Sequence, residues 1–157
     1  MQWMEASMLV LNYLLGGFFT GYWIIRLKDG RDLRTLGSGT MANDAVAGQL
    51  SLLKSKGIIP LNGEFDLRLN EHARRWDLDF DVIPSPYGEP LDYERLEETA
   101  NSGGYGWMWA VHGETSTGVL NDLDRLKQIS SRHGLLLALD CVISFGAVPF
   151  QLVRPRL

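Results

Sequence analysis

Residues 6–25 contain no charged side chain, and this run limits what the chain can fold into more than any other feature. A helix of 20 residues reaches about 30 Å, the thickness of the hydrocarbon core of a bilayer. A water-soluble helix of that length usually carries a polar face, and this run has none. Trp3 lies near one end of the run, and Tyr22 and Trp23 lie at the other, where amphipathic rings favour the headgroup region. The run therefore predicts one membrane-spanning helix.

Basic residues follow this run at once: Arg26, Lys28, Arg31 and Arg34. Positively charged loops stay in the cytoplasm, so we expect a membrane protein whose remaining, soluble part is cytoplasmic. A buried or interfacial helix and a cleaved signal segment remain as alternatives. The signal segment fits less well, because Glu5 and no basic residue precedes the run and no small-residue cleavage pattern follows it.

Composition excludes several classes of protein. The 157 residues leave room for one ordinary domain. With 15 basic and 19 acidic residues, the net charge of -4 offers no broad basic surface, so we expect no nucleic-acid partner. A single cysteine, Cys141, can form neither an intramolecular disulfide nor a multi-cysteine zinc site, and we predict no metal site.

Beyond Gly39 the chain alternates helical and strand-like patterns. Apolar spacing and capping signals predict helices over 40–53, 64–76, 92–100 and 121–132, and strands over 57–61, 79–83, 107–112 and 135–142. Asp92 is the expected N-cap of the third helix, and Gly134 is the expected C-cap of the fourth. The strand at 135–142 is apolar enough to be fully buried. The pattern predicts an α/β fold with a mostly parallel sheet, in which ligands bind beyond the carboxyl ends of the strands.

Polar clusters occupy three positions where ligands bind in such folds. Residues 37–40 (Gly-Ser-Gly-Thr) lead into a helix, where free N–H groups can hold a phosphate, although a flexible junction with a Thr cap fits equally. Residues 112–118 (His-Gly-Glu-Thr-Ser-Thr-Gly) follow a strand and are either a capped turn or a binding loop. Asp140 ends a strand expected to be buried, where an ionised carboxylate is costly unless it is paired. It therefore either caps a neighbouring element or contacts a cationic group of a ligand.

Four segments in this order resemble the class V pyridoxal-phosphate aminotransferases, of the serine–pyruvate, alanine–glyoxylate and 2-aminoethylphosphonate type. They are 36–42 (Leu-Gly-Ser-Gly-Thr-Met-Ala), 62–65 (Asn-Gly-Glu-Phe), 112–120 (His-Gly-Glu-Thr-Ser-Thr-Gly-Val-Leu) and 139–142 (Leu-Asp-Cys-Val). The resemblance covers residues 37–150. It implies an incomplete large domain of a fold-type I enzyme over residues 37–157, after a membrane segment over 1–36.

The resemblance also implies roles for individual residues. Ser38, Gly39 and Thr40 match the turn that binds the phosphate of pyridoxal 5'-phosphate. Phe65 matches the aromatic residue that stacks on the pyridine ring, and Thr115 matches the residue whose hydroxyl reaches the phenolic oxygen. Asp140 matches the carboxylate that pairs with the pyridinium nitrogen and preserves the electron sink of the cofactor.

The catalytic lysine of this family is missing. It forms the Schiff base and lies on a strand a few tens of residues after the matching Asp, where this chain has already ended. The four lysines are Lys28, Lys54, Lys56 and Lys127, all before Asp140, and we expect them to be solvated charges. The resemblance thus implies a family that transfers an amino group from an amino acid to a 2-oxo acid such as pyruvate or glyoxylate. We expect this chain to be an inactive fragment of such an enzyme. Ile143 and residues 151–157 also depart from the family pattern.

The N-terminal part resembles a different family, the bacterial membrane glycerol-3-phosphate acyltransferases that use acyl phosphate. Residues 12–22 and 30–39 carry this resemblance, which covers 8–39, but the Asn-Pro-Gly-Ala-Thr-Asn stretch expected next is absent. The two resemblances meet at 36–39, which suggests a fusion. Two alternatives therefore stand beside the aminotransferase fragment: an acyltransferase relic of phospholipid synthesis, and a non-enzymatic membrane-anchored α/β protein. A homodimer is implied by the first resemblance, and a sheet cut before its last strands predicts an unpaired edge.

Overall fold

The computed structural model describes residues 40–149. In chain order the elements are α3 (Thr40–Leu52), β1 (Lys56–Leu61), α4 (Glu64–Arg75), β2 (Phe80–Pro84), α5 (Tyr93–Asn101), β3 (Tyr105–Val111), β4 (Gly113–Glu114), β5 (Val119–Leu120), α6 (Leu123–His133) and β6 (Leu136–Asp140). All eight helices and strands predicted from the sequence are present. The predicted span at 6–25 and the predicted boundary at 36–37 lie outside the described residues. No helix within 40–149 has the length and apolar character that crossing a bilayer requires.

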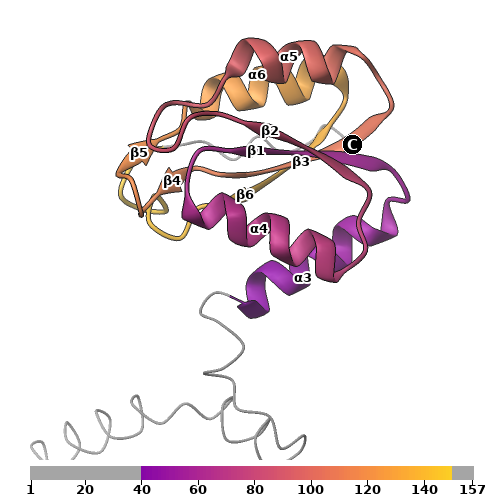
Figure 1. The fold of residues 1–157 in the computed structure, drawn as a ribbon, viewed down its shortest axis with the longest axis horizontal. Helices are drawn as coiled ribbons and strands as arrows, with labels where there is room; N and C mark the ends of the chain where they lie inside the picture. Colours follow the sequence, from indigo (N-terminus) through magenta and orange to yellow (C-terminus); the bar gives the residue numbers. More distant parts are fainter. Residues whose placement is uncertain (1–39, 150–157) are drawn as a thin grey trace, which may run out of the picture. The chain divides into compact units, whose positions relative to one another are not determined.

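The central sheet has four parallel strands in the order β2-β1-β3-β6. In register, Ile59 of β1 lies beside Val82 of β2, and Trp109 of β3 lies beside Ala138 of β6. The strands pair in parallel and helices connect them, so the predicted α/β class with a mostly parallel sheet is confirmed for the described residues, while the predicted transmembrane helix is not tested by them. The carboxyl ends of all four strands point to the same edge of the sheet (Figure 1).

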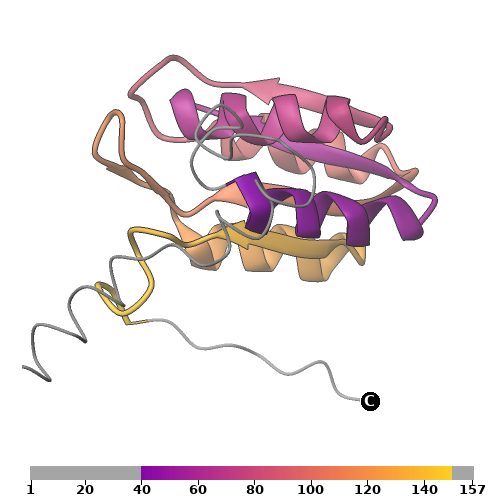
Figure 2. The same cartoon turned by 90° about the horizontal axis from the view of Figure 1, so that it is seen from below.

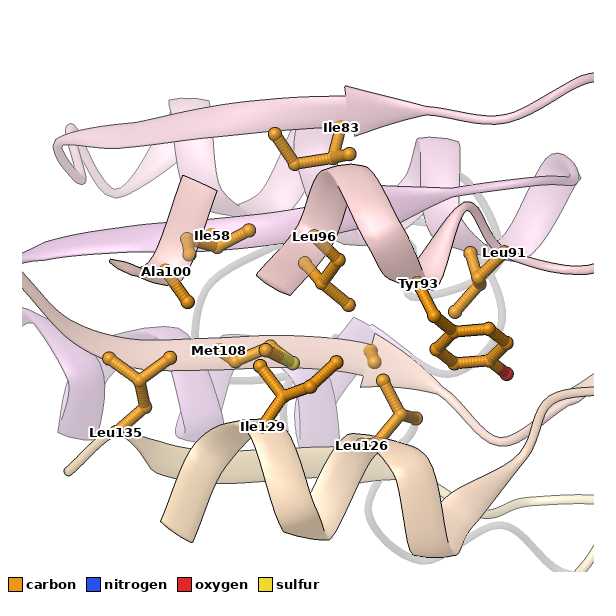
Figure 3. Close-up of a cluster of buried hydrophobic side chains, with 11 residues drawn as sticks. Ile58, Ile83, Leu91, Tyr93, Leu96, Ala100, Met108, Leu126, Ile129 and Leu135 are labelled. Atoms are coloured by element: carbon orange, nitrogen blue, oxygen red, sulfur yellow. The ribbon is translucent and has the colours of Figure 1, made fainter. Parts of the chain in front are cut away.

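Helices cover both faces of this sheet, with α5 and α6 on one side and α3 and α4 on the other (Figures 1 and 2). Successive side chains of a strand point to opposite faces, so Ile58 packs with α5 and α6 while Ile59 packs with α3 and α4. The core on the α5 and α6 side, drawn in Figure 3, is built from Ile58, Ile83, Leu91, Tyr93, Leu96, Ala100, Met108, Ala110, Leu126, Ile129 and Leu135. The other core contains Trp107 and Trp109, both almost fully buried.

Helix ends follow the predicted capping chemistry. Asp92 caps α5, and its carboxylate accepts a hydrogen bond from the backbone N–H of Arg95 at 3.0 Å. Gly134 ends α6 with φ of 67°, a left-handed conformation that glycine adopts at no steric cost. These two local signals fix where the helices on one face of the sheet begin and end.

The prediction of a fully buried last strand is wrong. Within the described residues β6 pairs with β3 alone, so it forms an edge of the sheet. Leu136 is 53% exposed, and the rest of the strand is half-buried. Apolar composition reports the hydrophobicity of a strand, but burial depends on whether a second neighbour covers it.

Candidate functional site

The candidate site lies where β1, β3 and β6 end. Phe65 follows β1 at the start of α4, Thr115 follows the short strand β4 that comes after β3, and Asp140 is the last residue of β6. Because β1 neighbours β3 and β3 neighbours β6, the three segments leave the same edge of the sheet next to one another. This is the edge at which parallel α/β sheets bind their ligands.

Glu114 joins two of these segments. It lies in the short hairpin of β4 and β5, which was not predicted because strands of two residues have no readable periodicity. Its side chain is fully buried, and its Oε2 atom accepts the backbone N–H of Phe65 at 2.9 Å. Its Oε1 atom accepts both the backbone N–H and the hydroxyl of Ser116, at 3.0 and 2.7 Å. Glu114 therefore caps the N-terminus of α4 from a distant part of the chain and holds Phe65 beside the 112–118 loop.

Gly63 makes this contact possible. A Cβ atom at Gly63 would lie 2.2 Å from Cγ of Glu114, far inside van der Waals contact. The backbone of Gly63 is extended, with φ of -167°, so close approach and not conformation requires glycine here.

Asp66 is a second buried carboxylate at this edge. It is fully buried on the first turn of α4, where its Oδ2 atom accepts the N–H of Asn62 at 3.0 Å and its Oδ1 atom accepts the N–H of Val111 at 3.3 Å. Burial raises the pKa of Asp66 to about 7, and the charges of Glu114 and Asp140 act in the same direction. The two N–H donors oppose this shift by favouring the ionised form.

Asp140 is half-buried beside these groups. Its Oδ1 atom accepts the N–H of Val142 at 3.1 Å, and its backbone carbonyl accepts the N–H of His112 at 2.9 Å. Within residues 40–149, no basic side chain forms an ion pair with Asp140, Asp66 or Glu114. Three carboxylates without a cationic partner make this edge suited to a positively charged ligand group, and the donor set thus fits a protonated pyridine ring.

Phe65 and Thr115 lie close in the fold, since Glu64 and Phe65 both donate backbone N–H groups to the loop that contains Thr115. The ring of Phe65 is half-buried, and the guanidinium of Arg68 lies over one of its faces at 4.6 Å. Thr115 is exposed to solvent. Their predicted contacts with a cofactor ring and its oxygen stay predictions.

Ser38 and Gly39, which are two of the three residues of the predicted phosphate turn, lie outside the described residues. Thr40, the third, begins helix α3. The position of Thr40 at a helix N-terminus is the backbone setting that a phosphate site needs, and the role of all three residues stays a prediction.

The described lysines lie at separate places on the surface. Lys54 follows α3 and is exposed, and Lys56 forms an ion pair with Asp81 at 2.8 Å at the amino end of the sheet. Lys127 of α6 pairs with Asp124 at 3.7 Å, but its charge also reaches the candidate site. Burial, and next the charge of Lys127, lower the pKa of His112. Lys127 is therefore a described lysine whose charge acts on a residue of the 112–118 loop.

A pocket of about 540 Å³ lies at the opposite, amino end of the strands. Its lining residues are Leu50, Ser51, Lys54, Ser55, Lys56, Trp76, Asp77, Leu78 and Asp79. None of the predicted site residues contributes to this pocket. Its position excludes it as the ligand site that the sequence predicts.

Known proteins resemble this part of the chain in sequence. A 2-aminoethylphosphonate–pyruvate transaminase of Pseudomonas fluorescens is 34% identical over 118 residues, which cover 73% of this chain and 31% of that enzyme. The corresponding transaminase of Burkholderia thailandensis is 30% identical over 134 residues, covering 82% and 36%. The chain thus spans about a third of the length of the curated relatives it matches.

Solved structures agree with the sequence comparison. An alanine–glyoxylate aminotransferase from Nostoc has a TM-score of 0.65 and 32% identity, over 72% of this chain and 30% of that one. An aspartate aminotransferase from Thermus thermophilus has a TM-score of 0.61 and 32% identity, over 69% and 30%.

The N-terminal part matches a different family. A family model described as glycerol-3-phosphate acyltransferase matches residues 6–58, which extends past the predicted end of that resemblance at residue 39. Both resemblances that the sequence motifs indicated are therefore confirmed, and they overlap through helix α3.

Proposed function

Because residues 40–149 are homologous to a segment of the class V aminotransferases, we propose that they form the cofactor-binding part of a pyridoxal-phosphate-dependent aminotransferase. The reaction of such an enzyme moves an amino group from an amino acid to a 2-oxo acid such as pyruvate or glyoxylate. One observation carries this proposal: a segment 34% identical to a transaminase also has the sheet of a solved aminotransferase, at a TM-score of 0.65.

The residues of the site divide the binding task. The N-terminus of α3, with Ser38, Gly39 and Thr40, binds the phosphate through backbone N–H groups. Phe65 stacks on the ring, and Thr115 donates its hydroxyl to the phenolic oxygen. Asp140 holds a proton on the ring nitrogen by pairing with the positive charge. When bound, the cofactor supplies an electron sink for bonds at the α-carbon of an amino acid.

This chain lacks one part of that machinery. No lysine of the sequence follows Asp140, and a class V enzyme needs one there for covalent and acid–base work. We therefore expect these 157 residues, taken by themselves, to bind pyridoxal 5'-phosphate without completing amino-group transfer. The amino acid and the 2-oxo acid are the substrates of a complete aminotransferase of this class.

Borohydride reduction tests this proposal directly. The full chain, purified in detergent, is mixed with pyridoxal 5'-phosphate, binding is followed by absorbance, and the mixture is reduced and mapped by mass spectrometry. We expect saturable binding, no lysine labelled stoichiometrically, and an affinity about tenfold lower for Asp140→Asn because it loses a charge-assisted contact. Asp81→Asn, at the other end of the sheet, is the matched control. Equal binding by wild type and Asp140→Asn contradicts the proposed site, and stoichiometric labelling of one lysine, with Lys127 checked first, contradicts the inactive fragment.

A second proposal concerns residues 1–36, and it is supported by the acyltransferase family match over residues 6–58. In this proposal the uncharged run 6–25 anchors the chain in a membrane, and the α/β part faces the cytoplasm. Alkaline extraction of isolated membranes tests the anchor, and protease protection tests the orientation. Release at high pH contradicts anchoring.

Turnover of acyl phosphate with glycerol 3-phosphate by the detergent-purified chain favours the acyltransferase alternative. Absence of acyl transfer, of amino-group transfer and of cofactor binding favours a non-enzymatic anchored protein.

The family resemblance also supports assembly. We propose a homodimer, and the exposed edge of β6 favours pairing with another chain. Light scattering of the detergent-solubilised chain distinguishes a dimer from a monomer.

A further inference from the structure

Asp66 was not predicted as a site residue, because an acidic side chain on the first turn of a helix is commonly a solvated cap. In the structure it is fully buried next to Phe65 on α4. Its two carboxylate oxygens each accept a backbone N–H, from Asn62 at 3.0 Å and from Val111 at 3.3 Å. The contact with Asn62 is local to the start of the helix, but a residue that only completes a first turn does not need the second contact, with the end of strand β3.

The donors place Asp66 at a junction of three elements. Asn62 directly follows β1, and Val111 is the last residue of β3. Val111 is also the register partner of Asp140, and the next residue, His112, donates its N–H to the carbonyl of Asp140 at 2.9 Å. The carboxylate of Asp66 thus accepts an N–H at the end of β3, on the side from which β1 has already departed. Asp140 lies on the opposite side of the same residue of β3, in the neighbouring strand β6.

Electrostatics at this junction are finely balanced. The groups that face Asp66 from neighbouring elements are Glu114 of β4 and Asp140 of β6, both acidic, together with the two N–H donors. No basic side chain within residues 40–149 pairs with Asp66. The ionised carboxylate satisfies both donors, while burial and the two neighbouring carboxylates favour the protonated form.

We propose that Asp66 is a positioning residue of the cofactor site. Its carboxyl group holds the end of β3 and, through it, Asp140 in position. Whether Asp66 carries a proton also determines how much negative charge faces the ring nitrogen. This inference rests on the proposed function. A protonated pyridine ring next to Asp140 adds a positive charge that favours ionised Asp66. Ligand binding therefore releases a proton from Asp66, and affinity rises with pH while Asp66 loses that proton.

The size of the effect follows from the titration of Asp66. Its pKa is raised to about 7, so at pH 6 most of the free protein carries protonated Asp66, and at pH 8 most carries the ionised form. If the bound state holds ionised Asp66, its contribution makes binding about tenfold tighter at pH 8 than at pH 6. The ring and the phosphate of the free ligand also titrate, but the free ligand is the same for wild type and variants, so a difference between their pH profiles reports on the protein.

Calorimetry of the full chain in detergent with pyridoxamine 5'-phosphate tests the proposal. This probe has no aldehyde, so it does not react with surface lysines. Between pH 6 and pH 8, wild type should gain about tenfold more affinity than Asp66→Asn. In buffers of different ionisation enthalpy, wild type should release more protons near pH 7 than the variant. Asp81→Asn is the control and should behave as wild type.

The outcomes separate the two claims. Binding with the same pH dependence and the same proton release in wild type and Asp66→Asn overturns the role of Asp66 and leaves the proposed function intact. Absence of binding by wild type at every pH overturns the proposed function and this inference with it.

A ligand-free measurement covers the case in which Asp66→Asn does not fold. Carbon-13 NMR of the side-chain carboxyl groups follows the titration of Asp66 in wild type and in Asp140→Asn. Removing the charge of Asp140 should lower the pKa of Asp66. An unchanged titration of Asp66 in Asp140→Asn overturns the coupling between the two groups and the inference.

Discussion

The two ends of the same parallel strands hold their acidic residues in opposite ways. At the amino end, Asp81 is partly exposed and accepts hydrogen bonds from Lys56 at 2.8 Å and from the hydroxyl of Tyr105. At the carboxyl end, Asp66 and Glu114 are fully buried and accept hydrogen bonds from backbone N–H groups and a serine hydroxyl. The amino end holds a partly exposed ion pair, and the carboxyl end holds buried carboxylates that form no ion pair with a basic side chain of residues 40–149.

The two arrangements shift the pKa in opposite directions. The hydrogen bond from Lys56, followed by that from Tyr105, lowers the pKa of Asp81, whereas burial raises the pKa of Asp66 to about 7. A lysine neutralises its partner, while backbone N–H groups satisfy the hydrogen-bonding capacity of a carboxylate without cancelling its whole charge. The residual charge at the carboxyl end is what a cationic ligand group can use. Four substitutions test this comparison, beginning with the largest expected effect.

Glu114→Ala should be the most damaging change at the carboxyl end. It removes a fully buried side chain, which opens a cavity, and it deprives the partly buried N–H groups of Phe65 and Ser116 of their acceptor, so we expect a loss of about 3 kcal/mol of unfolding free energy. Urea denaturation followed by circular dichroism measures it. Glu98→Ala, at an exposed position of α5, is the matched control and should change stability by less than about 0.5 kcal/mol. Similar losses from the two substitutions would refute the claim that the buried carboxylate joins these segments.

Gly63→Ala comes next, because its methyl group would overlap the side chain of Glu114. We expect a cost of about 2 kcal/mol, which is typical of overpacking. Gly106→Ala offers a comparison at the amino end, where the new Cβ atom would lie 2.2 Å from Oγ of Ser55, a small side chain at only partly buried depth. Rotation of the hydroxyl relieves only the contact with Oγ, since Cβ of Ser55 would lie 2.6 Å from the new atom and must also shift. Because Ser55 lies in the partly exposed connection between α3 and β1, that shift should be easier than moving buried Glu114, so Gly106→Ala should cost less in the same denaturation experiment. A larger loss of unfolding free energy from Gly106→Ala would show that side chains pack more tightly at the amino end of the sheet than at the carboxyl end.

The pH dependence of stability should separate Asp66 from Asp81. A carboxyl group whose folded pKa is raised favours folding in its protonated form, and this contribution is lost as pH rises through the folded pKa. Wild type should therefore lose about 1 kcal/mol more than Asp66→Asn between pH 6 and pH 8. Asp81→Asn should keep the slope of wild type, since a lowered pKa acts only in acid. Parallel pH profiles for wild type and Asp66→Asn would contradict a raised pKa for Asp66.

Asp81→Asn should have the smallest effect of the four. Its ion pair with Lys56 is open to solvent on one side, with 36% and 42% of the two side chains exposed, and such pairs contribute little. We expect no measurable change in melting temperature at pH 7, with or without 0.5 M salt (about 4 Å of Debye screening). A clear loss of stability would show that the amino end of the sheet depends on this pair.

Much of this fold can be predicted from the sequence. Apolar spacing identifies the four helices and four long strands, since each packs one face or both against a core. Asp92 and Gly134 mark helix ends because their effects are local. The exposure of β6 cannot be predicted in this way, because it depends on which strand lies beside it. The β4–β5 hairpin is too short to leave a periodic signal.

The candidate site is predictable to a smaller extent. Motif resemblance points to Phe65, Thr115 and Asp140, and the fold carries their segments to one edge of the sheet. Asp66 and Glu114 escape such reasoning because their burial arises from contacts between residues 45 and 49 positions apart in the chain. A polar residue beside a motif becomes informative only when the fold shows whether water can reach it.

The two indole rings on β3 give the molecule an optical property of its own. Trp107 and Trp109 lie in the core beneath α3 and α4, and the ring nitrogen of Trp107 donates to the carbonyl of Ser55 at 3.0 Å. Indole emission shifts to longer wavelengths when water gains access to the ring. Detachment of α3 from the sheet should thus appear as a red shift of fluorescence, visible even in the absence of any bound vitamin derivative.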